Sequence, residues 1–331
     1  MTEMTSAVPE LTIVTPCYNE ERTLEDCIRS VLRLRDHVEG LEILIIDDGS
    51  QDGSVAVSKR LAETHAEVRL VEHGRNRGKG AALRTGFQEA RGRFVCVQDA
   101  DLEYDPMDIL KLLAPLRDDR ADFVLGSRYA ARTERRVLYF WHSVMNQILT
   151  LLSNMMSNLD LTDMETCYKV FRRDIINSID LKENRFGFEP EVVAKMAALN
   201  CRVYEIPINY NPRSYEEGKK INWKDGARAL YCILRYGGPN APAPVQLGLY
   251  ACVGLTAAVA NLLLFLTLTH WAPPFPAALA AFAGAAFINY RLCVLFVFNQ
   301  YARFSKRSEL PVYFAIISAI GLFDASATLG F

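Results

Sequence analysis

Residues 94–101 read FVCVQDAD, a short apolar run from Phe94 to Gln98 that leads directly into Asp99-Ala100-Asp101. Four further apolar runs of strand length alternate with segments of helical period: Leu11 to Thr15, Leu41 to Ile46, Val68 to Val71 and Phe123 to Ser127. Strands that alternate with helices predict an α/β fold with a mostly parallel sheet.

The segment between the first two of these runs has the period of a helix with one apolar face. Its apolar residues fall at positions i, i+3, i+4, i+7 and i+8: Leu24, Cys27, Ile28, Val31 and Leu32. Residues at this spacing lie on one side of an α-helix, so we expect this face to pack on the sheet. Residues 79–90 are expected to form a second such helix.

Polar residues follow four of the five apolar runs: Pro16 to Glu20, Asp47 to Ser50, Asp99 to Asp101 and Gly126 to Tyr129. Open α/β sheets bind ligands beyond the carboxyl ends of their strands, so we expect these residues to share a cleft. The turn after the first run has no G-x-G-x-x-G, which disfavours a dinucleotide-binding dehydrogenase, and Gly78-Lys79-Gly80 does not complete a P-loop.

Asp99 and Asp101 are candidate metal ligands. Two carboxylates at a strand end can both offer oxygen to one hard divalent cation, with phosphate oxygens completing its shell. Mg²⁺ or Mn²⁺ is the expected cofactor. A surface turn is the alternative, and it applies equally to Asp47-Asp48-Gly49, because Asp-Gly is a common turn sequence.

Five motifs in order resemble one enzyme family: P-x-Y-N-E at 16–20, D-D-G-S at 47–50, N-R-G-K-G at 76–80, D-A-D at 99–101 and G-S-R-Y at 126–129. Over roughly residues 10–235 the chain resembles the family 2 glycosyltransferases of GT-A fold, in the polyprenyl-phosphate branch that includes the dolichyl-phosphate mannose synthases. The resemblance implies a Rossmann-like catalytic domain, a nucleotide-sugar donor and a dolichyl or undecaprenyl phosphate acceptor.

The resemblance also implies roles for single residues. The nucleotide half of the donor is assigned to Pro16, Tyr18, Glu20, Asp48, Lys79 and Asp99. The metal on the diphosphate is assigned to Asp99 and Asp101. Glu103 stands where family members often carry glutamine, so the third metal ligand is left open. For Lys79, a charged first turn of a helix is the alternative.

Two further segments extend the resemblance towards the acceptor. Residues 162–169, TDMETCYK, resemble the acceptor-side segment, which makes Asp163, together with Asp101, a candidate catalytic carboxylate. Residues 213–220 resemble a basic loop that closes over the phosphates, and phosphate or acceptor binding is therefore assigned to Arg213, Lys219 and Lys220. Arg128 joins this group, because a guanidinium can hold a phosphate by two parallel bonds. A turn aspartate, a charged surface loop and a structural salt bridge are the respective alternatives.

Between Arg235 and Arg291 the chain has no Asp, Glu, Lys or Arg. We therefore divide it into a catalytic domain at 1–236 and a transmembrane region at 237–331. The expected spans are 245–269, 275–298 and 310–331, each long enough for a hydrocarbon core of roughly 30 Å. Basic residues follow the second span at 303–307, and the positive-inside rule places them in the cytoplasm together with the catalytic domain.

Membrane contact is also expected near residues 136–158, where aromatic and Met side chains follow several arginines. This composition favours a helix lying in the membrane interface, with a core helix as the alternative. Asn289-Tyr290-Arg291 resembles the GtrA-like membrane domain, and paired membrane helices are compatible with a homo-oligomer. The net charge of −2 indicates no nucleic-acid partner.

These observations predict metal-dependent, inverting transfer of a hexose from a nucleotide sugar to polyprenyl phosphate. UDP-glucose is favoured because the T-C-Y-K segment and the appended spans resemble the bacterial glucosyl-lipid enzymes, and a GDP-mannose-dependent mannose synthase is the alternative. A lipid-carrier binding or flipping module without catalysis is the alternative from another class. The intact D-A-D and N-R-G-K-G motifs argue against it.

Overall fold

The computed structural model describes residues 8–130, 136–137, 139–212, 223–298, 311–315 and 318 of the 331-residue chain. The chain divides into two compact units, Met1–Ile233 and Leu234–Phe331. The first unit holds a β-sheet with helices, and the second holds long apolar helices.

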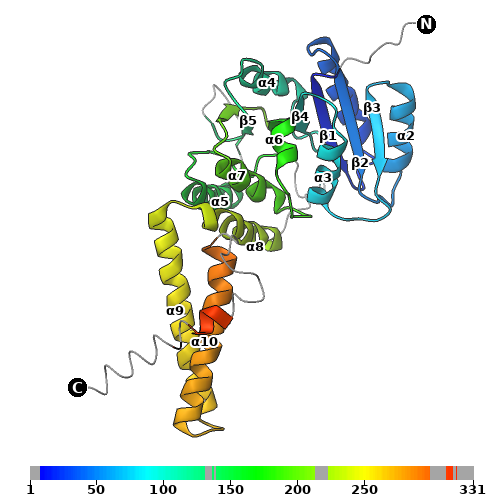
Figure 1. Ribbon diagram of the computed structural model, residues 1–331. Coiled ribbons are helices and arrows are strands. Elements are labelled where there is room, and N and C mark those ends of the chain that lie inside the picture. The colour runs from blue at the N-terminus through cyan, green and yellow to red at the C-terminus, as the bar shows by residue number, and fades with distance from the viewer. Residues whose placement is uncertain are drawn as a thin grey trace. The chain divides into compact units, whose positions relative to one another are not determined.

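The first unit is built on a seven-stranded sheet with the spatial order β3-β2-β1-β4-β6-β5-β7 (Figure 1). The strands are β1 Leu11–Cys17, β2 Leu41–Asp47, β3 Val68–Glu72, β4 Phe94–Val97, β5 Phe123–Ser127, β6 Lys169–Arg172 and β7 Val203–Pro207. Strand β6 runs antiparallel to β4 and β5, and the other paired strands are parallel. The predicted mostly parallel sheet is confirmed.

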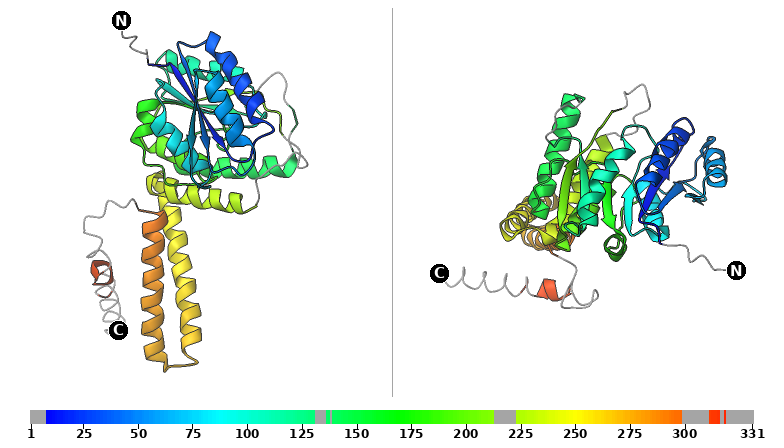
Figure 2. Two further views of the ribbon diagram at one scale, coloured as in Figure 1. Left: turned by 90° about the vertical axis from the view of Figure 1, so that its right-hand side faces the viewer. Right: turned by 90° about the horizontal axis from the view of Figure 1, so that it is seen from above.

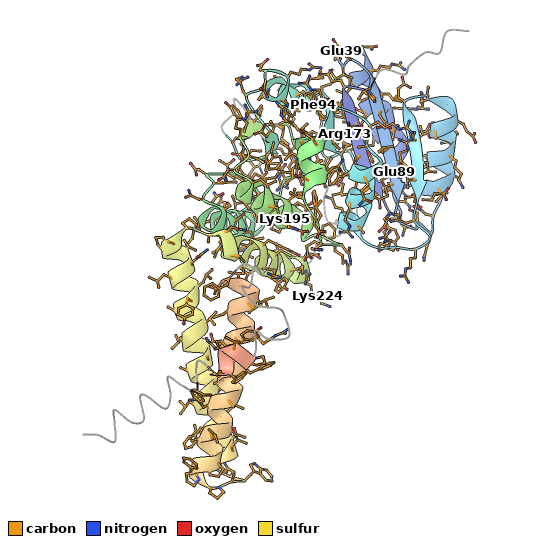
Figure 3. The ribbon with its side chains drawn as sticks, in the orientation of Figure 1. Glu39, Glu89, Phe94, Arg173, Lys195 and Lys224 are labelled. Carbon is orange, nitrogen blue, oxygen red and sulfur yellow. The ribbon has the colours of Figure 1, made fainter. Side chains whose placement is uncertain are left out.

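The central strands are apolar because both of their faces are covered. Strand β2 is buried at every position and β4 likewise, whereas β3 at the edge is only partly buried. Phe94 begins β4 in the interior, and Arg173 begins the helix that follows β6 (Figure 3). The backbone N–H of Arg173 donates to the carbonyl of Arg93 at 3.1 Å, which places this helix at the amino end of β4.

Helices flank the sheet (Figures 1 and 2). They are α1 Leu24–Leu32, η1 Arg33–Asp36, α2 Ser54–Thr64, α3 Lys79–Glu89, η2 Pro106–Asp108, α4 Ile109–Arg117, α5 Phe140–Ser157, α6 Arg173–Ser178, α7 Phe188–Ala198 and α8 Trp223–Cys232. The five apolar residues predicted to form one face of α1 are all buried. Helix α3 packs on β1 and β2, and α4 packs on β5 and β6.

The parallel register brings the ends of the strands to one edge. Cys17, the last residue of β1, pairs with Asp47, the last residue of β2, and Val14 of β1 pairs with Val97 at the end of β4. The residues that follow these strands therefore leave the sheet on the same side, which is the side where a ligand is expected.

Helix α5 has one buried and one exposed side, and it packs on α7 and α8. Its exposed apolar side chains are Phe140, Trp141, Met145, Ile148, Leu151 and Met155. Trp141 is 75% exposed. Packing in the core therefore explains the buried face of α5 but not its exposed apolar face. An interfacial role for the other face stays a prediction.

The second unit contains π-helix η4 Ile233–Gly237, which begins at the end of the first unit, η5 Gly238–Asn240, α9 Ala243–Leu268 and α10 Pro274–Phe296. Helices α9 and α10 lie side by side (Figure 2) and enclose a small apolar cluster around Val253, Cys293 and Val297. Both are long and apolar enough to cross a membrane. Most of the third expected span, 310–331, lies outside the described residues.

Candidate active site

A cavity of about 450 Å³ lies beyond the carboxyl ends of β1, β2, β4 and β5. The residues after each of these strands contribute to its wall, together with the start of α3 and the start of α7. Of the residues predicted from the sequence, the cavity is lined by Pro16, Tyr18, Glu20, Asp48, Lys79, Asp99, Asp101 and Arg128. Fold topology thus brings these eight into one space, although their individual roles stay predictions.

The other predicted site residues are placed differently. Asp163 is fully buried and is not among the residues that line the cavity. Arg213, Lys219 and Lys220 lie outside the described residues, so the predicted basic loop has no structural account here.

Asp47 and Asp48 stabilise the turn and the loop around the cavity. Oδ2 of Asp47 accepts from the backbone N–H groups of Gly49 and Ser50 at 3.0 and 3.1 Å, which is the turn role given as an alternative. Oδ2 of Asp48 accepts from the N–H of Gly78 at 2.7 Å, and Oδ1 accepts from that of Arg77 at 3.0 Å. Asp48 therefore anchors the N-R-G-K-G loop as well as lining the cavity.

The glycines of that loop are required by a close backbone approach. Gly78 has a φ of +97°, and a Cβ atom there would lie 2.2 Å from the carbonyl oxygen of Asn184. A Cβ on Gly80 would lie 2.4 Å from the carbonyl oxygen of Glu183. The positive φ of Gly78 favours glycine, and neither position has room for a Cβ atom. Lys79 therefore begins α3 between two glycines, with its side chain at the cavity.

Lys79 forms ion pairs with two acidic residues of the cavity. Its Nζ lies 2.9 Å from Oδ1 of Asp99 and 3.1 Å from Oε1 of Glu189. Burial alone would lower the pKa of Lys79, but Asp99 and Glu189 outweigh it and raise that pKa well above its ordinary value. Lys79 is therefore a fixed positive charge beside the predicted metal ligands.

Asp101 and Glu103 form the other side of the predicted metal site. Oδ1 of Asp101 accepts from the backbone N–H of Glu103 at 3.1 Å. Oε2 of Glu103 accepts from the hydroxyl of Tyr210 at 2.8 Å, and both residues line the cavity. Glu103 thus lies near enough to the D-A-D motif to keep the third ligand position open.

A divalent cation fits this donor set. Hard cations of the size of Mg²⁺ and Mn²⁺ take oxygen ligands, and one or two carboxylates plus substrate phosphates are the usual supply. Among the described residues no group of three or more His, Cys, Asp or Glu side chains forms a closed metal site. Asp99 and Asp101 would hold the cation together with phosphate oxygens of a bound ligand.

Arg128 connects the cavity to Asp163. Its Nε and Nη2 donate to the two carboxylate oxygens of Asp163 at 2.7 and 2.8 Å, and its backbone N–H donates to Oδ2 at 3.0 Å. Asn146 of α5 donates to Oδ1 of the same carboxylate at 3.2 Å. Asp163 lies behind the guanidinium, which itself lines the cavity, so the geometry favours a positioning role for Asp163.

Several residues of the cavity wall were not predicted from the sequence, among them Glu165, Glu189 and Tyr210. Glu165 lies in the segment TDMETCYK at 162–169, two residues after Asp163. A second acid so close to a candidate catalytic aspartate was the feature that could have indicated it. Glu189 is the second residue of α7, in the segment Phe188-Glu189-Pro190-Glu191, and belongs to no motif noted in the sequence. Tyr210 follows β7, which no apolar run predicted.

Residues 12–180, which include strands β2 to β6 and all of β1 except Leu11, match the model of glycosyl transferase family 2, and residues 249–330 match that of the GtrA/DPMS transmembrane domain. This chain belongs to glycosyltransferase family 2. The membrane-domain match, together with α9 and α10, makes it a membrane protein.

Three curated glycosyltransferases are similar to this chain, and the aligned region covers a different share of each. The undecaprenyl-phosphate mannosyltransferase of Micrococcus luteus is 32% identical over 69% of this chain and 93% of its own length. The dodecaprenyl-phosphate galacturonate synthase of Rhizobium johnstonii is 27% identical over 63% and 61%. Glycosyltransferase AglD of Haloferax volcanii is 26% identical over 63% and 34%. The chain therefore spans less than two thirds of the last two relatives.

Among solved structures, the glucosyl-3-phosphoglycerate synthase of Mycobacterium tuberculosis in complex with Mn²⁺, uridine diphosphate and glucosyl-3-phosphoglycerate has a TM-score of 0.55. The match is 18% identical and covers 70% of this family 2 chain and 80% of that one. At this identity the likeness shows the fold alone, and it confirms the predicted GT-A fold.

Proposed function

We propose that this chain transfers a hexosyl group from a nucleotide sugar to polyprenyl phosphate, with a divalent cation at Asp99 and Asp101. The observation that carries the proposal is the cavity itself. Asp99 and Asp101 line the same space as Tyr18 and Asp48, so diphosphate and nucleoside can be held at once. The polyprenyl acceptor is supported by relatives whose names include undecaprenyl and dodecaprenyl phosphate.

Binding of the donor is assigned to the residues after β1, β2 and β4. Pro16, Tyr18, Glu20 and Asp48 would hold the nucleobase and ribose, and Lys79 would face the diphosphate. A bound Mg²⁺ or Mn²⁺ would offset the negative charge of the departing nucleoside diphosphate. The Mn²⁺ in the solved structure of the same fold supports a divalent cation.

The acceptor needs little activation. A phosphate monoester has a second pKa near 6, so it is largely dianionic at neutral pH and attacks without a strong base. Arg128 would hold this phosphate, and Asp163 would fix the orientation of Arg128 through the two hydrogen bonds to its guanidinium. Attack from the face opposite the diphosphate inverts the anomeric carbon, so an α-linked donor gives a β-linked lipid.

Two features support access to a lipid-bound phosphate. The exposed apolar face of α5, which includes Trp141 and Met145, suits the boundary between headgroups and acyl chains. The positive-inside rule applied to residues 303–307 favours a cytoplasmic catalytic domain, the compartment that supplies nucleotide sugars.

UDP-glucose remains the first donor to test, on the resemblance of the T-C-Y-K segment to glucosyl-lipid enzymes. GDP-mannose is the second, because the Micrococcus relative, of which this chain covers 93%, is named a mannosyltransferase. Both reactions use the same cavity and the same acceptor.

The proposal is tested with the full chain purified in detergent, MgCl₂, undecaprenyl phosphate and a panel of radiolabelled nucleotide sugars. We expect one sugar to appear in the lipid fraction, and EDTA to abolish its transfer. Binding of lipid phosphate without product from any donor would support the non-catalytic carrier module instead. Transfer that persists in EDTA would remove the cation from the proposal while leaving the transferase.

A further inference from the structure

Two carboxyl groups that the proposed nucleotide and cation sites do not use line the same cavity. Glu165 lies in the loop that precedes β6, and Glu189 lies in the first turn of α7. Each has one buried carboxyl oxygen, Oε1 of Glu165 and Oε2 of Glu189, with no hydrogen-bond partner among the described residues. Glu189 is only 4% exposed, so solvent has little access to it.

The position of Glu189 is fixed by its other oxygen. Oε1 of Glu189 is 3.1 Å from Nζ of Lys79, and Lys79 also holds Asp99 at 2.9 Å. Lys79 thus pairs with both Glu189 and Asp99. The unpaired Oε2 of Glu189 therefore lies close to Asp99, the carboxylate that is proposed to bind the cation. A ligand group at this subsite would therefore lie next to the proposed diphosphate.

Buried acceptors without partners are rare in native proteins, and each one calls for an explanation such as a ligand or a bound water. Two such acceptors on one cavity wall favour a ligand that brings hydrogen-bond donors. Phosphate oxygens at neutral pH bring none and are repelled by carboxylates. The nucleoside is already assigned to the residues after β1 and β2. The remaining part of a nucleotide sugar, the hexosyl group, carries hydroxyl donors.

We propose that Glu165 and Glu189 bind hydroxyl groups of the transferred sugar, and that they select a neutral hexosyl donor over a uronosyl donor. The inference rests on the function proposed above and adds the class of sugar to it. A uronosyl group keeps its ring hydroxyls but carries a carboxylate in place of the C6 hydroxyl. That carboxylate would offer no donor to the unpaired Oε2 of Glu189 and would be repelled by the charge of Glu189. A site built to bond hydroxyls discriminates strongly against a ligand that leaves its buried groups unpaired.

The experiment compares binding rather than turnover. Calorimetry in detergent with MgCl₂ measures the affinity of the full chain for UDP, UDP-glucose and UDP-glucuronate, and for GDP and GDP-mannose as the second pair. In the wild type we expect UDP-glucose to bind more tightly than UDP-glucuronate by at least about tenfold, since one hydrogen bond to a charged group is of that order. If the chain takes GDP sugars instead, GDP-mannose is compared with GDP-mannuronate in the same way.

Glu165→Gln and Glu189→Gln test the two residues, and Glu63→Gln on the exposed surface of α2 is the matched control. We expect each cavity variant to lose about tenfold in affinity for the neutral donor, while its affinity for the nucleoside diphosphate changes less than threefold. The double variant is expected to lose the preference over UDP-glucuronate. Thermal unfolding of each variant shows whether it is folded.

The outcomes separate this inference from the proposed function. A wild type that forms lipid-linked product, with Gln variants that keep both donor affinity and preference, overturns the inference alone. Equal loss for the nucleoside diphosphate and the nucleotide sugar in folded variants also overturns it, because the residues would then act on the nucleotide half. A wild type that binds no nucleoside diphosphate overturns the function and the inference together.

Discussion

Nζ of Lys79 lies 2.9 Å from Oδ1 and 3.0 Å from Oδ2 of Asp99, so the ammonium group contacts both oxygens of the first aspartate of D-A-D. Lys79 and Asp99 come from the motifs N-R-G-K-G and D-A-D, which are twenty residues apart in sequence. The contact joins two elements of the family pattern into one electrostatic unit, which Glu189 extends. In the proposed function, Lys79 would be a positive group already in place beside the cation and the diphosphate.

Lys79→Met is expected to weaken nucleotide-sugar binding by at least about tenfold, because the diphosphate loses a charge-assisted hydrogen bond. It also leaves Glu189 buried without its partner, which costs on the order of 3 kcal/mol in the free energy of unfolding. Calorimetry and denaturant unfolding measure the two effects. Lys59→Met is the control, since Lys59 pairs with Glu72 on an exposed surface. Equal effects in both variants would contradict the role given to Lys79.

Asp99→Asn and Asp101→Asn are each expected to lower transfer by at least about 100-fold, because an amide of the same shape neutralises a ligand of the cation. The apparent Mg²⁺ requirement should shift to higher concentration in any residual activity. Asp118→Asn, at a side chain that is 59% exposed, is the control. Full activity in both cavity variants would rule out the metal assignment.

Much of the fold follows from local sequence because the strands are buried on both faces. The runs at Leu41 and Phe94 are nearly continuous in apolar residues, and they form β2 and β4. Polar residues directly after such runs can only emerge at the carboxyl edge of the sheet, which is why Asp48, Asp99 and Arg128 were predictable as neighbours.

The rest of the site depends on tertiary packing that no local pattern reports. Strand β6 is four residues long and antiparallel, and it inserts between β4 and β5. That insertion places Glu165 on the cavity and Asp163 behind Arg128, although the two acids are two residues apart. Glu189 reaches the cavity through its pairing with Lys79, a contact 110 residues apart in sequence.

Asp163→Asn separates a positioning role from direct catalysis. The Arg128 guanidinium would keep a neutral partner of similar shape but lose the charge that holds it, so we expect the KM for polyprenyl phosphate to rise at least about fivefold with a smaller change in the KM for the donor. Steady-state kinetics with each substrate varied in turn measure the difference. A fall in kcat with both KM values unchanged would restore the catalytic role predicted from the sequence.

Gly78→Ala is expected to disrupt the loop that presents Lys79. The added Cβ would lie 2.2 Å from the carbonyl oxygen of Asn184, in a backbone with a φ of +97°. The backbone N–H of residue 78, which donates a hydrogen bond to Oδ2 of Asp48, would have to move. We expect loss of donor binding and a free energy of unfolding lower by about 1–3 kcal/mol. Gly74→Ala is a matched control, because its added Cβ would meet nothing within 4 Å. Similar losses in both would contradict the packing argument.

The stability of the chain should depend on pH through Glu165. Burial, with Glu189 nearby, raises the pKa of Glu165 from 4.5 to about 8. The charged groups that act on it are Glu189, Lys169, Arg128 and Asp163. Between pH 4.5 and about 8 the folded chain keeps a proton on Glu165 that the unfolded chain releases. The free energy of unfolding therefore falls as pH rises through this window, by at most about 1.4 kcal/mol per pH unit from this group.

Glu165→Gln removes that proton from both states, so the variant should gain stability relative to the wild type between pH 5 and pH 8. Thermal unfolding in detergent at three pH values across the window measures the gain as a widening difference in Tm. Glu63→Gln on α2 should follow the wild type at every pH, since its side chain is exposed. A constant difference between Glu165→Gln and the wild type would mean that the carboxyl group is already ionised in the folded chain, and that a cationic neighbour such as Lys169 compensates for its burial.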